Sequence, residues 1–150
     1  MSQDIFYRVH DGDPDEVMRL SEDFCSQLFP SLAPNFVRSR LPYVAEPQLC
    51  LAERAARPVG FKLSYRLSST ILFSWLGGVL PEARRQGIAA GLMQFQHREA
   101  VAAGYSHVET RTRTSNNAMI MLNLAHGFEI VGLETDAFGR FVVIQRKPLS

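Results

Sequence analysis

The sequence predicts one α/β domain of the α+β type, in which about four helices flank a mixed, mostly antiparallel sheet of about seven strands. Residues 49–80 contain three strand-like segments in succession, which is typical of an antiparallel meander. Residues 70–127 then follow a strand, helix, strand, helix order. A length of 150 residues and a hydrophobic content of 46% fit a single core, so we expect the domain to span residues 1–150.

The first elements are a strand and a helix. Residues 5–9 alternate enough to predict a strand, and residues 13–16, Asp-Pro-Asp-Glu, supply a helix cap, a proline at the first helical position and early acids. Pro30 ends this helix, whose apolar face is formed by Val17, Leu20, Phe24 and Leu28. Residues 32–47 hold three prolines and predict a loop with one short helix.

Three strands follow, at residues 49–54, 60–67 and 70–80, with a break at Arg57-Pro58 between the first two. The segment Ile71–Leu76 is apolar on both faces, which predicts a strand in the interior of the sheet. The Gly77-Gly78 pair within the third strand predicts either a bulge or a close approach of another group to the backbone.

The second half alternates helices and strands. Residues 87–103 have apolar side chains on one helical face, and Gly104 is well placed to end that helix. A strand is predicted at residues 107–113, and a short helix ends at Gly127. The last pair of strands is predicted at residues 128–133 and 141–145.

The composition disfavours several kinds of partner and site. The 16 Lys and Arg nearly balance the 15 Asp and Glu, so no global charge favours nucleic acid or an anionic membrane. Cys25 and Cys50 are the only cysteines, and we expect free buried thiols and no metal site. No segment approaches the roughly 20 apolar residues of a membrane span, and the first residues lack the pattern of a signal peptide, so we expect a cytoplasmic protein.

The segment from Val79 to Ala89 carries the clearest chemical signal. It joins a buried strand to a helix through a short turn that contains Arg84 and Arg85 and ends at Gly87. The first amides of a helix have no partners inside the helix and carry the positive end of its dipole, so this turn is suited to a pyrophosphate. The phosphate-loop pattern GxxxxGK[ST] is absent, and GxGxxG follows none of the predicted strands.

Two motifs resemble those of the GNAT superfamily of N-acetyltransferases. Arg84-x-x-Gly87-x-Ala89, preceded by Val79-x-Pro81, is similar to the family signature (Arg/Gln)-x-x-Gly-x-(Gly/Ala). Further along, the chain resembles the second family motif, with the alanine offset by one residue, at Asn116, Ala118, Met119, Leu122, Gly127 and Phe128. The two motifs occur in the family's order, on the strands and helices that its fold requires.

The resemblance implies how acetyl-CoA would bind as a cosubstrate. The sheet would be splayed between its fourth and fifth strands, residues 70–80 and 107–113, and acetyl-CoA would enter the cleft between them. The backbone of Val79 would pair with the pantetheine arm, and Asn116 would reach that arm from the far side. The pyrophosphate would be held by the turn and the first helical amides, at Arg84, Arg85, Gln86, Gly87, Ile88 and Ala89.

The catalytic groups match the family less well. Many members carry a tyrosine five residues before the Phe of the Gly-Phe pair, where it protonates the departing thiolate, but this chain has Asn123. An amide can donate a hydrogen bond to the sulfur of the cofactor but cannot deliver a proton. The carboxylate that many members place on the central strand is also absent, since residues 71–76 offer only Ser74. Candidates for proton transfer are Glu109, Tyr65 and Glu53, although a strand residue of these types is more often an exposed one that faces solvent.

These features predict an acetyl-CoA-dependent N-acetyltransferase that acts on a primary amine of a small molecule or a protein. The alternative is a regulatory or sensor protein that binds acyl-CoA but turns over weakly, because the tyrosine and the strand carboxylate are missing. We expect neither nucleic acid nor a membrane as a partner. A homodimer would fit this architecture, although no segment of the sequence identifies an interface.

Overall fold

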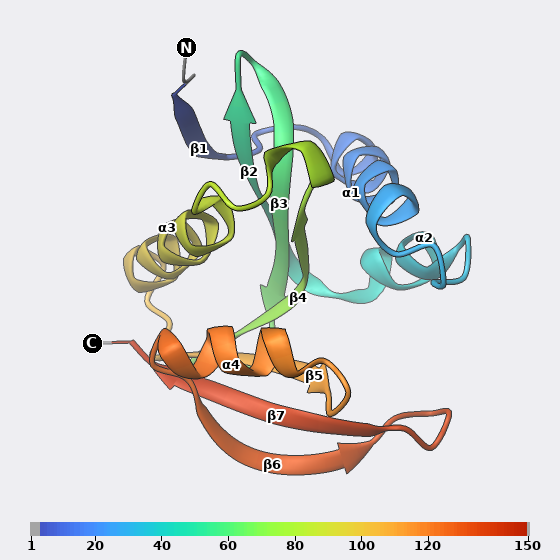
Figure 1. Cartoon of the computed structure of the whole chain (residues 1–150), viewed down its shortest axis with the longest axis vertical. Helices are drawn as coiled ribbons and strands as arrows, with labels where there is room; N and C mark the ends of the chain where they lie inside the picture. The colour runs from blue at the N-terminus through green and yellow to red at the C-terminus, as the bar shows by residue number, and fades with distance from the viewer. Residues whose placement is uncertain (1–3, 150) are drawn as a thin grey trace.

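The computed structural model describes residues 4–149, so residues 1–3 and 150 of the expected domain lie outside the described part. The predicted α+β fold and the order of its elements are confirmed (Figure 1): β1 (Ile5–Val9), α1 (Pro14–Leu28), α2 (Phe36–Arg40), the 3-10 turn η1 (Leu41–Tyr43), β2 (Ala45–Arg54), β3 (Arg57–Arg66), β4 (Ile71–Val79), the 3-10 turn η2 (Pro81–Ala83), α3 (Ile88–Ala102), β5 (His107–Arg113), α4 (Asn117–Ala125), β6 (Glu129–Thr135) and β7 (Phe141–Pro148).

The seven strands within residues 4–149 form one sheet in the order β1-β2-β3-β4-β5-β7-β6. Neighbouring strands are antiparallel except for β4 and β5, which pair in parallel. The apolar strand β4 lies in the interior of the sheet, as its sequence predicts. Helices α1 and α2 cover one face of the sheet, while α3 and α4 lie against the other (Figure 1).

The core forms two layers because alternate residues of a strand point to opposite faces. On the side of α1 and α2, the strand residues Leu49, Leu51, Phe61 and Leu63 pack with side chains of those helices. On the side of α3, Cys50, Ala52, Val59 and Val79 pack with Ile88 and Leu92. Both cysteines are buried and free, as predicted.

The start of α1 follows its sequence signature. The side chain of Asp13 accepts a hydrogen bond from the backbone N–H of Glu16 at 2.9 Å, and the Glu16 side chain accepts one from the Asp13 N–H at 3.3 Å. This reciprocal capping box satisfies two helix-terminal donors. Within residues 4–149, no helix is long and apolar enough to cross a membrane.

Two local expectations need correction. Strand β2 begins at Ala45, inside the segment predicted as loop, because a bulge between Ala45 and Gln48 accommodates Pro47. The turn between β2 and β3 lies at Ala55-Ala56, both with positive φ, and not at Arg57-Pro58.

Of the two alternatives predicted for Gly77-Gly78, the close approach of another group is confirmed. The bulge of β4 lies nearby at Trp75, because Ser74 pairs with Ser64 while Leu76 pairs with Leu63. A Cβ on Gly78 would lie 2.7 Å from Leu28 Cδ1, and one on Gly77 would lie 3.1 Å from the Phe61 carbonyl oxygen.

Candidate active site

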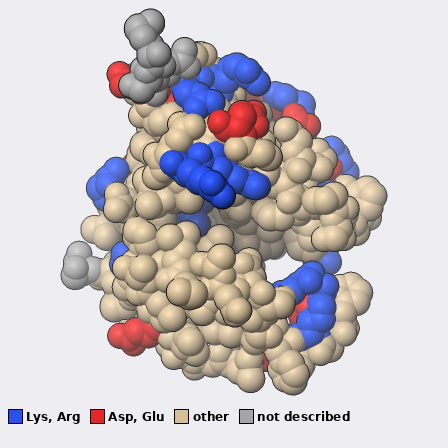
Figure 2. Space-filling model, in the orientation of Figure 1, with Lys and Arg blue, Asp and Glu red and all other residues tan. Residues whose placement is uncertain are grey.

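The parallel strands β4 and β5 separate after a short stretch of pairing. Only Ile71–Phe73 pair with His107–Glu109, and the hydroxyl of Thr110 then donates to the Ser74 carbonyl at 3.0 Å. Beyond this point the two strands enclose a cavity of about 730 Å³. The space-filling view is hollowed between the part that carries β1–β4 and the part that carries β5–β7 (Figure 2). The predicted splay between the fourth and fifth strands is therefore confirmed.

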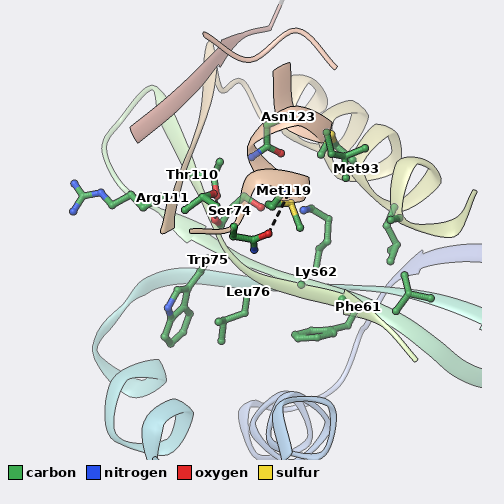
Figure 3. Close-up of a pocket in the computed structure, with 18 of the residues that line it drawn as sticks. Phe61, Lys62, Ser74, Trp75, Leu76, Met93, Thr110, Arg111, Met119 and Asn123 are labelled. Carbon is green, nitrogen blue, oxygen red and sulfur yellow. Dashed lines mark hydrogen bonds between the residues drawn. The ribbon is translucent and has the colours of Figure 1, made fainter. Parts of the chain in front are cut away.

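The cavity is lined by the diverging strands and by both helices of one face. Strand β4 contributes Ser74 to Val79, β5 contributes Thr110 to Arg113, α3 contributes Ala89, Leu92, Met93 and His97, and α4 contributes Met119, Leu122 and Asn123. Around the cavity, Ser74, Met119 and Asn123 lie on one side of the sheet, whereas Phe61, Trp75 and Leu76 point toward α1 and α2 (Figure 3). Helix α4 and strand β4 contain no ionisable side chain.

The edge of β4 that faces the cavity leaves backbone groups available. The N–H of Leu80 donates to the Val59 carbonyl at 2.8 Å, which makes the neighbouring pair of Val79 and Gly60 a non-hydrogen-bonded pair of the ladder. The N–H and C=O of Val79 therefore point toward the cavity, and alternation gives Gly77 the same orientation. The Val79 carbonyl accepts a hydrogen bond from Arg84 Nε at 3.1 Å. A ligand with amide groups can pair with this edge as an added strand.

The turn between β4 and α3 ends in glycine because its backbone requires a positive φ. Gly87 is the N-cap residue with φ +76°, and α3 begins at Ile88, whose buried side chain anchors the first turn of the helix. No side chain caps these amides, and a Cβ on Gly87 would meet nothing within 4 Å. The N-terminus of α3 is thus open to an anion.

The side chains of this turn add positive charge. Arg84 and Arg85 are exposed there, and Lys and Arg side chains gather over the segment that joins β4 to α3 (Figure 2). Gln86 accepts a hydrogen bond from Arg54 Nη1 at 3.1 Å, which ties the turn to β2. Ala89 is exposed and lines the cavity. The predicted cofactor residues of the first motif therefore lie together, around the N-terminus of α3.

The second motif positions α4 on the opposite wall. Asn116 is the N-cap of α4, where its Oδ1 accepts from the Met119 N–H at 3.2 Å, and it lines the cavity. Asn123 also lines the cavity but is 2% exposed, and its Nδ2 donates to Gln145 Oε1 at 2.9 Å. Gln145 in turn donates to the Ile120 carbonyl at 3.2 Å. The Asn123 amide therefore fastens α4 to β7.

The candidate proton-transfer residues lie away from these walls. Glu109 is buried, and one of its oxygens accepts from Arg146 Nη2 at 2.7 Å on the neighbouring strand β7. Tyr65 packs on Phe73 and Trp75, with ring centroids 5.1 Å and 5.7 Å away, and burial raises its pKa. Neither is among the residues that line the cavity. Their catalytic role stays a prediction.

Glu53, the third candidate, forms an ion pair with Arg8 of β1 at 2.6 Å. It lies on β2, which is separated from the cleft by β3. The structure therefore brings the cofactor candidates together around the cavity and leaves the three proton-transfer candidates apart from it.

The predicted site residues leave out four ionisable residues that line the cavity, which are Lys62, His97, Arg111 and Arg113. Lys62 is the one whose strand pairs with the part of β4 that lines the cavity. It lies on β3 opposite Gly77, is partly buried, and rises from the sheet between α3 and α4 (Figure 3). Burial lowers its pKa to about 8. Its position between Phe61 and Leu63 is the signal that could have found it. A lysine inside a strand with helices on both faces of the sheet cannot point to open solvent.

Comparison with known proteins agrees with this geometry. Residues 16–128 match the sequence profile of the Acetyltransferase (GNAT) family. No curated protein matches the chain at a significant level.

Among solved structures, aminoglycoside 6'-acetyltransferase type Ii is similar with a TM-score of 0.79 and 16% identity, covering 97% of each chain. The ribosomal-protein-S18-alanine N-acetyltransferase from Escherichia coli has a TM-score of 0.77 and 16% identity over 97% of this chain and 95% of that one. An Elizabethkingia anophelis GNAT family acetyltransferase with acetyl-CoA bound has a TM-score of 0.76 and 16% identity over 97% and 98%. The family profile covers most of the chain, so the protein belongs to the Acetyltransferase (GNAT) family, and the prediction of an acetyltransferase enzyme is confirmed.

Proposed function

We propose that the protein transfers the acetyl group of acetyl-CoA to a primary amine of a small molecule or a protein. The observation that carries the proposal is the continuity between the uncapped N-terminus of α3 and the open edge of β4. The helix end is suited to the pyrophosphate, and the strand edge is suited to the amides of the pantetheine arm. A solved family member of 16% identity holds acetyl-CoA, which supports this choice of cosubstrate.

The residues that would hold acetyl-CoA follow from these two features. Val79 would pair with the pantetheine arm, and Asn116 and Asn123 would face that arm from the wall of α4. The pyrophosphate would be bound by the turn before α3 and the first amides of that helix, at Arg84, Arg85, Gln86, Gly87, Ile88 and Ala89. Arg84 would exchange its bond to the Val79 carbonyl for one to the phosphate.

Substitution of Gly87 tests the anion site. Gly87→Glu places bulk and negative charge where the pyrophosphate would lie, so we expect at least about a hundred-fold weaker binding of acetyl-CoA, or about 2.7 kcal/mol. Gly104→Glu is the matched control, because Gly104 follows the end of the same helix with φ +91°, and a Cβ there would also meet nothing within 4 Å. It carries the same backbone strain without touching the site. Calorimetry in which both variants bind like the wild type would reject this location of the pyrophosphate.

A second candidate function is an acyl-CoA sensor with weak turnover. It is favoured by one observation: no carboxylate occurs among the described residues that line the cavity, so no carboxylate base there can accept the amine proton directly. Release of CoA thiol from acetyl-CoA, measured across a panel of primary amines, separates the two functions. We expect at least one amine to accelerate thiol release by about a hundred-fold or more over water. A sensor would bind acetyl-CoA and release no thiol with any amine.

A further inference from the structure

The side chain of Lys62 crosses the strand along which the pantetheine arm would run. A Cβ on Gly77 would lie 3.1 Å from Lys62 Cγ and 3.6 Å from Lys62 Nζ. The lysine therefore lies directly over the Cα of Gly77, and a larger residue there would displace it. Its Nζ reaches the cavity between α3 and α4, on the side of Met119 (Figure 3).

No carboxylate lines the cavity around Lys62 among the described residues, and the one acid that acts on the neighbouring Cys50 thiol is Glu99 of α3. Among the described residues that line the cavity, the other ionisable ones are His97 and the three arginines Arg84, Arg111 and Arg113. Cys50 is its cross-strand neighbour on β2, and its thiol has a pKa raised by burial to about 12. Burial also lowers the pKa of His97 to about 3, so that imidazole is neutral. Lys147 of β7 and His126, which follows α4, both lie near His97 and are also basic.

The proposed path of the cofactor brings its sulfur to this lysine, so the role of Lys62 rests on the proposed function. The pantetheine arm has two amides, which would pair with the open backbone groups of β4 at Val79 and then at Gly77, about two residues or 7 Å apart. The sulfur lies one short ethylene link beyond the second amide. It would therefore lie just past Gly77, within reach of the Nζ of Lys62.

We propose that Lys62 is the catalytic residue that protonates the sulfur of CoA when the thioester is cleaved. The acceptor nitrogen attacks the acetyl carbonyl carbon, and the C–S bond then breaks with its electron pair going to sulfur. An N–H proton of the Lys62 ammonium passes to that sulfur, which gives the free CoA thiol and a neutral lysine amine. The acceptor nitrogen loses one proton to water, and water returns a proton to Lys62, so the reaction is balanced.

The chemistry of Lys62 suits this role where Asn123 does not. An ammonium whose pKa is about 8 is largely protonated at neutral pH. Its acidity is close to that of a thiol, whose ordinary pKa is about 8.5, so proton transfer to the thiolate is nearly balanced in energy. The amide of Asn123 has no proton to give and is bonded to Gln145. Lys62 would thus do the work of the tyrosine that this chain lacks.

The ionisation of bound CoA tests the position of Lys62 without any acceptor. Thiolate absorbance of CoA bound to the wild type, Lys62→Met and Lys62→Arg is titrated with pH. A cation within about 4–6 Å lowers an acid's pKa by about 1–3 units, so the bound thiol should titrate at least about one unit lower in the wild type and Lys62→Arg than in Lys62→Met. Lys147→Met is the control, because it removes a lysine of the same face that lies outside the cavity lining.

Turnover then tests the proton transfer. With an amine identified by the thiol-release panel, the turnover of the wild type should fall as pH rises above about 8, while Lys62→Met loses about a hundred-fold or more of kcat and this dependence. Lys62→Arg keeps the positive charge, but its guanidinium does not release a proton in this pH range. It should therefore bring the pKa of the bound CoA thiol back to the wild-type value without restoring turnover. Equal thiol pKa values in wild type and Lys62→Met, with CoA bound by both, would overturn the proposal and leave the acetyltransferase function standing. Failure of the wild type to bind CoA would instead reject the proposed function itself.

Discussion

Two cationic side chains on opposite faces of the sheet have contrasting surroundings. Arg146, on the face that α1 and α2 cover, binds the buried carboxylate of Glu109 at 2.7 Å. Lys62, on the face of α3 and α4, projects into a cavity whose described lining residues include no carboxylate. Burial lowers the pKa of Lys62 to about 8 because it disfavours the charged form of the side chain. No carboxylate among the described cavity residues stabilises that charged form.

The difference separates stability from function. The charge of Arg146 neutralises the buried carboxylate of Glu109, so the folded protein loses stability when Arg146 is removed. An unpaired charge in a cavity is unfavourable to the fold, which is the pattern expected of a group that acts on a ligand. Exchanging each cation for methionine should therefore change the stability of the protein in opposite directions.

The largest effect is expected for Arg146→Met. Among the described residues, it would leave the buried Glu109 carboxylate with Arg111, at 3.9 Å, as its remaining ion-pair partner, and we expect the free energy of unfolding to fall by about 3 kcal/mol. Arg140→Met is the matched control, because Arg140 pairs with Asp136 at 2.8 Å on the surface and should have little effect. Denaturant unfolding measures both. A loss no greater than that of the control would show that Glu109 does not depend on this pair.

Glu109→Gln distinguishes a structural from a catalytic role for Glu109. The half-exposed Arg146 can reach water when its partner is neutral, so we expect a smaller loss of stability than in Arg146→Met. A fall in turnover of about a hundred-fold with unchanged stability would instead identify Glu109 as the general base.

The Lys62→Met substitution should stabilise the protein at neutral pH, by on the order of 2 kcal/mol. The folded-state pKa of Lys62 is lowered from 10.5 to about 8. The penalty for charging the lysine in the folded protein is therefore fully present below pH 8 and disappears as pH rises toward 10.5. Thermal unfolding at about pH 7 and about pH 10.5 tests the sign. A variant less stable than the wild type at neutral pH would mean that Lys62 contributes to folding, as Arg146 does.

The smallest effect is expected for Asn123→Ala. We expect turnover to fall by about ten-fold or less, because the amide donates hydrogen bonds but supplies no proton. The substitution leaves the fully buried Gln145 Oε1 without its donor, so unfolding should become easier by about 1–2 kcal/mol. Asn117→Ala, at an exposed position of the same helix, is the control. A thousand-fold loss of kcat with unchanged affinity for acetyl-CoA would make Asn123 essential to catalysis.

Sequence patterns predict most of the fold because its elements carry local signatures. The capping box at Asp13 and Glu16 marks the start of α1, and the apolar run of β4 marks the central strand. The errors fall where tertiary structure overrides local preference. Pro47 is accommodated by a bulge in β2, and Ala55 and Ala56 adopt the positive φ usually left to glycine, which moves the turn.

The residues of the candidate site were also predictable from the sequence only in part. The residues around Gly87 could be found because a helix N-terminus binds anions through its backbone, and the motif that forms it is contiguous. The role of Lys62 depends on its cross-strand neighbour Gly77, which lies on the next strand along the chain, and on helices that cover it from elsewhere in the chain. The position of Lys62 between Phe61 and Leu63 indicates burial, but the groups that surround its Nζ are set by the assembled sheet and cannot be read from the sequence.

A crystal structure of the protein with CoA tests the central claim most directly. We expect the pyrophosphate at the amides of Ile88 and Ala89, the pantetheine arm along the open edge of β4, and the sulfur within about 4 Å of Lys62 Nζ. CoA bound outside the cleft between β4 and β5 would contradict the proposed function. CoA in that cleft with its sulfur turned away from Lys62, toward another proton donor, would contradict the role of the lysine alone.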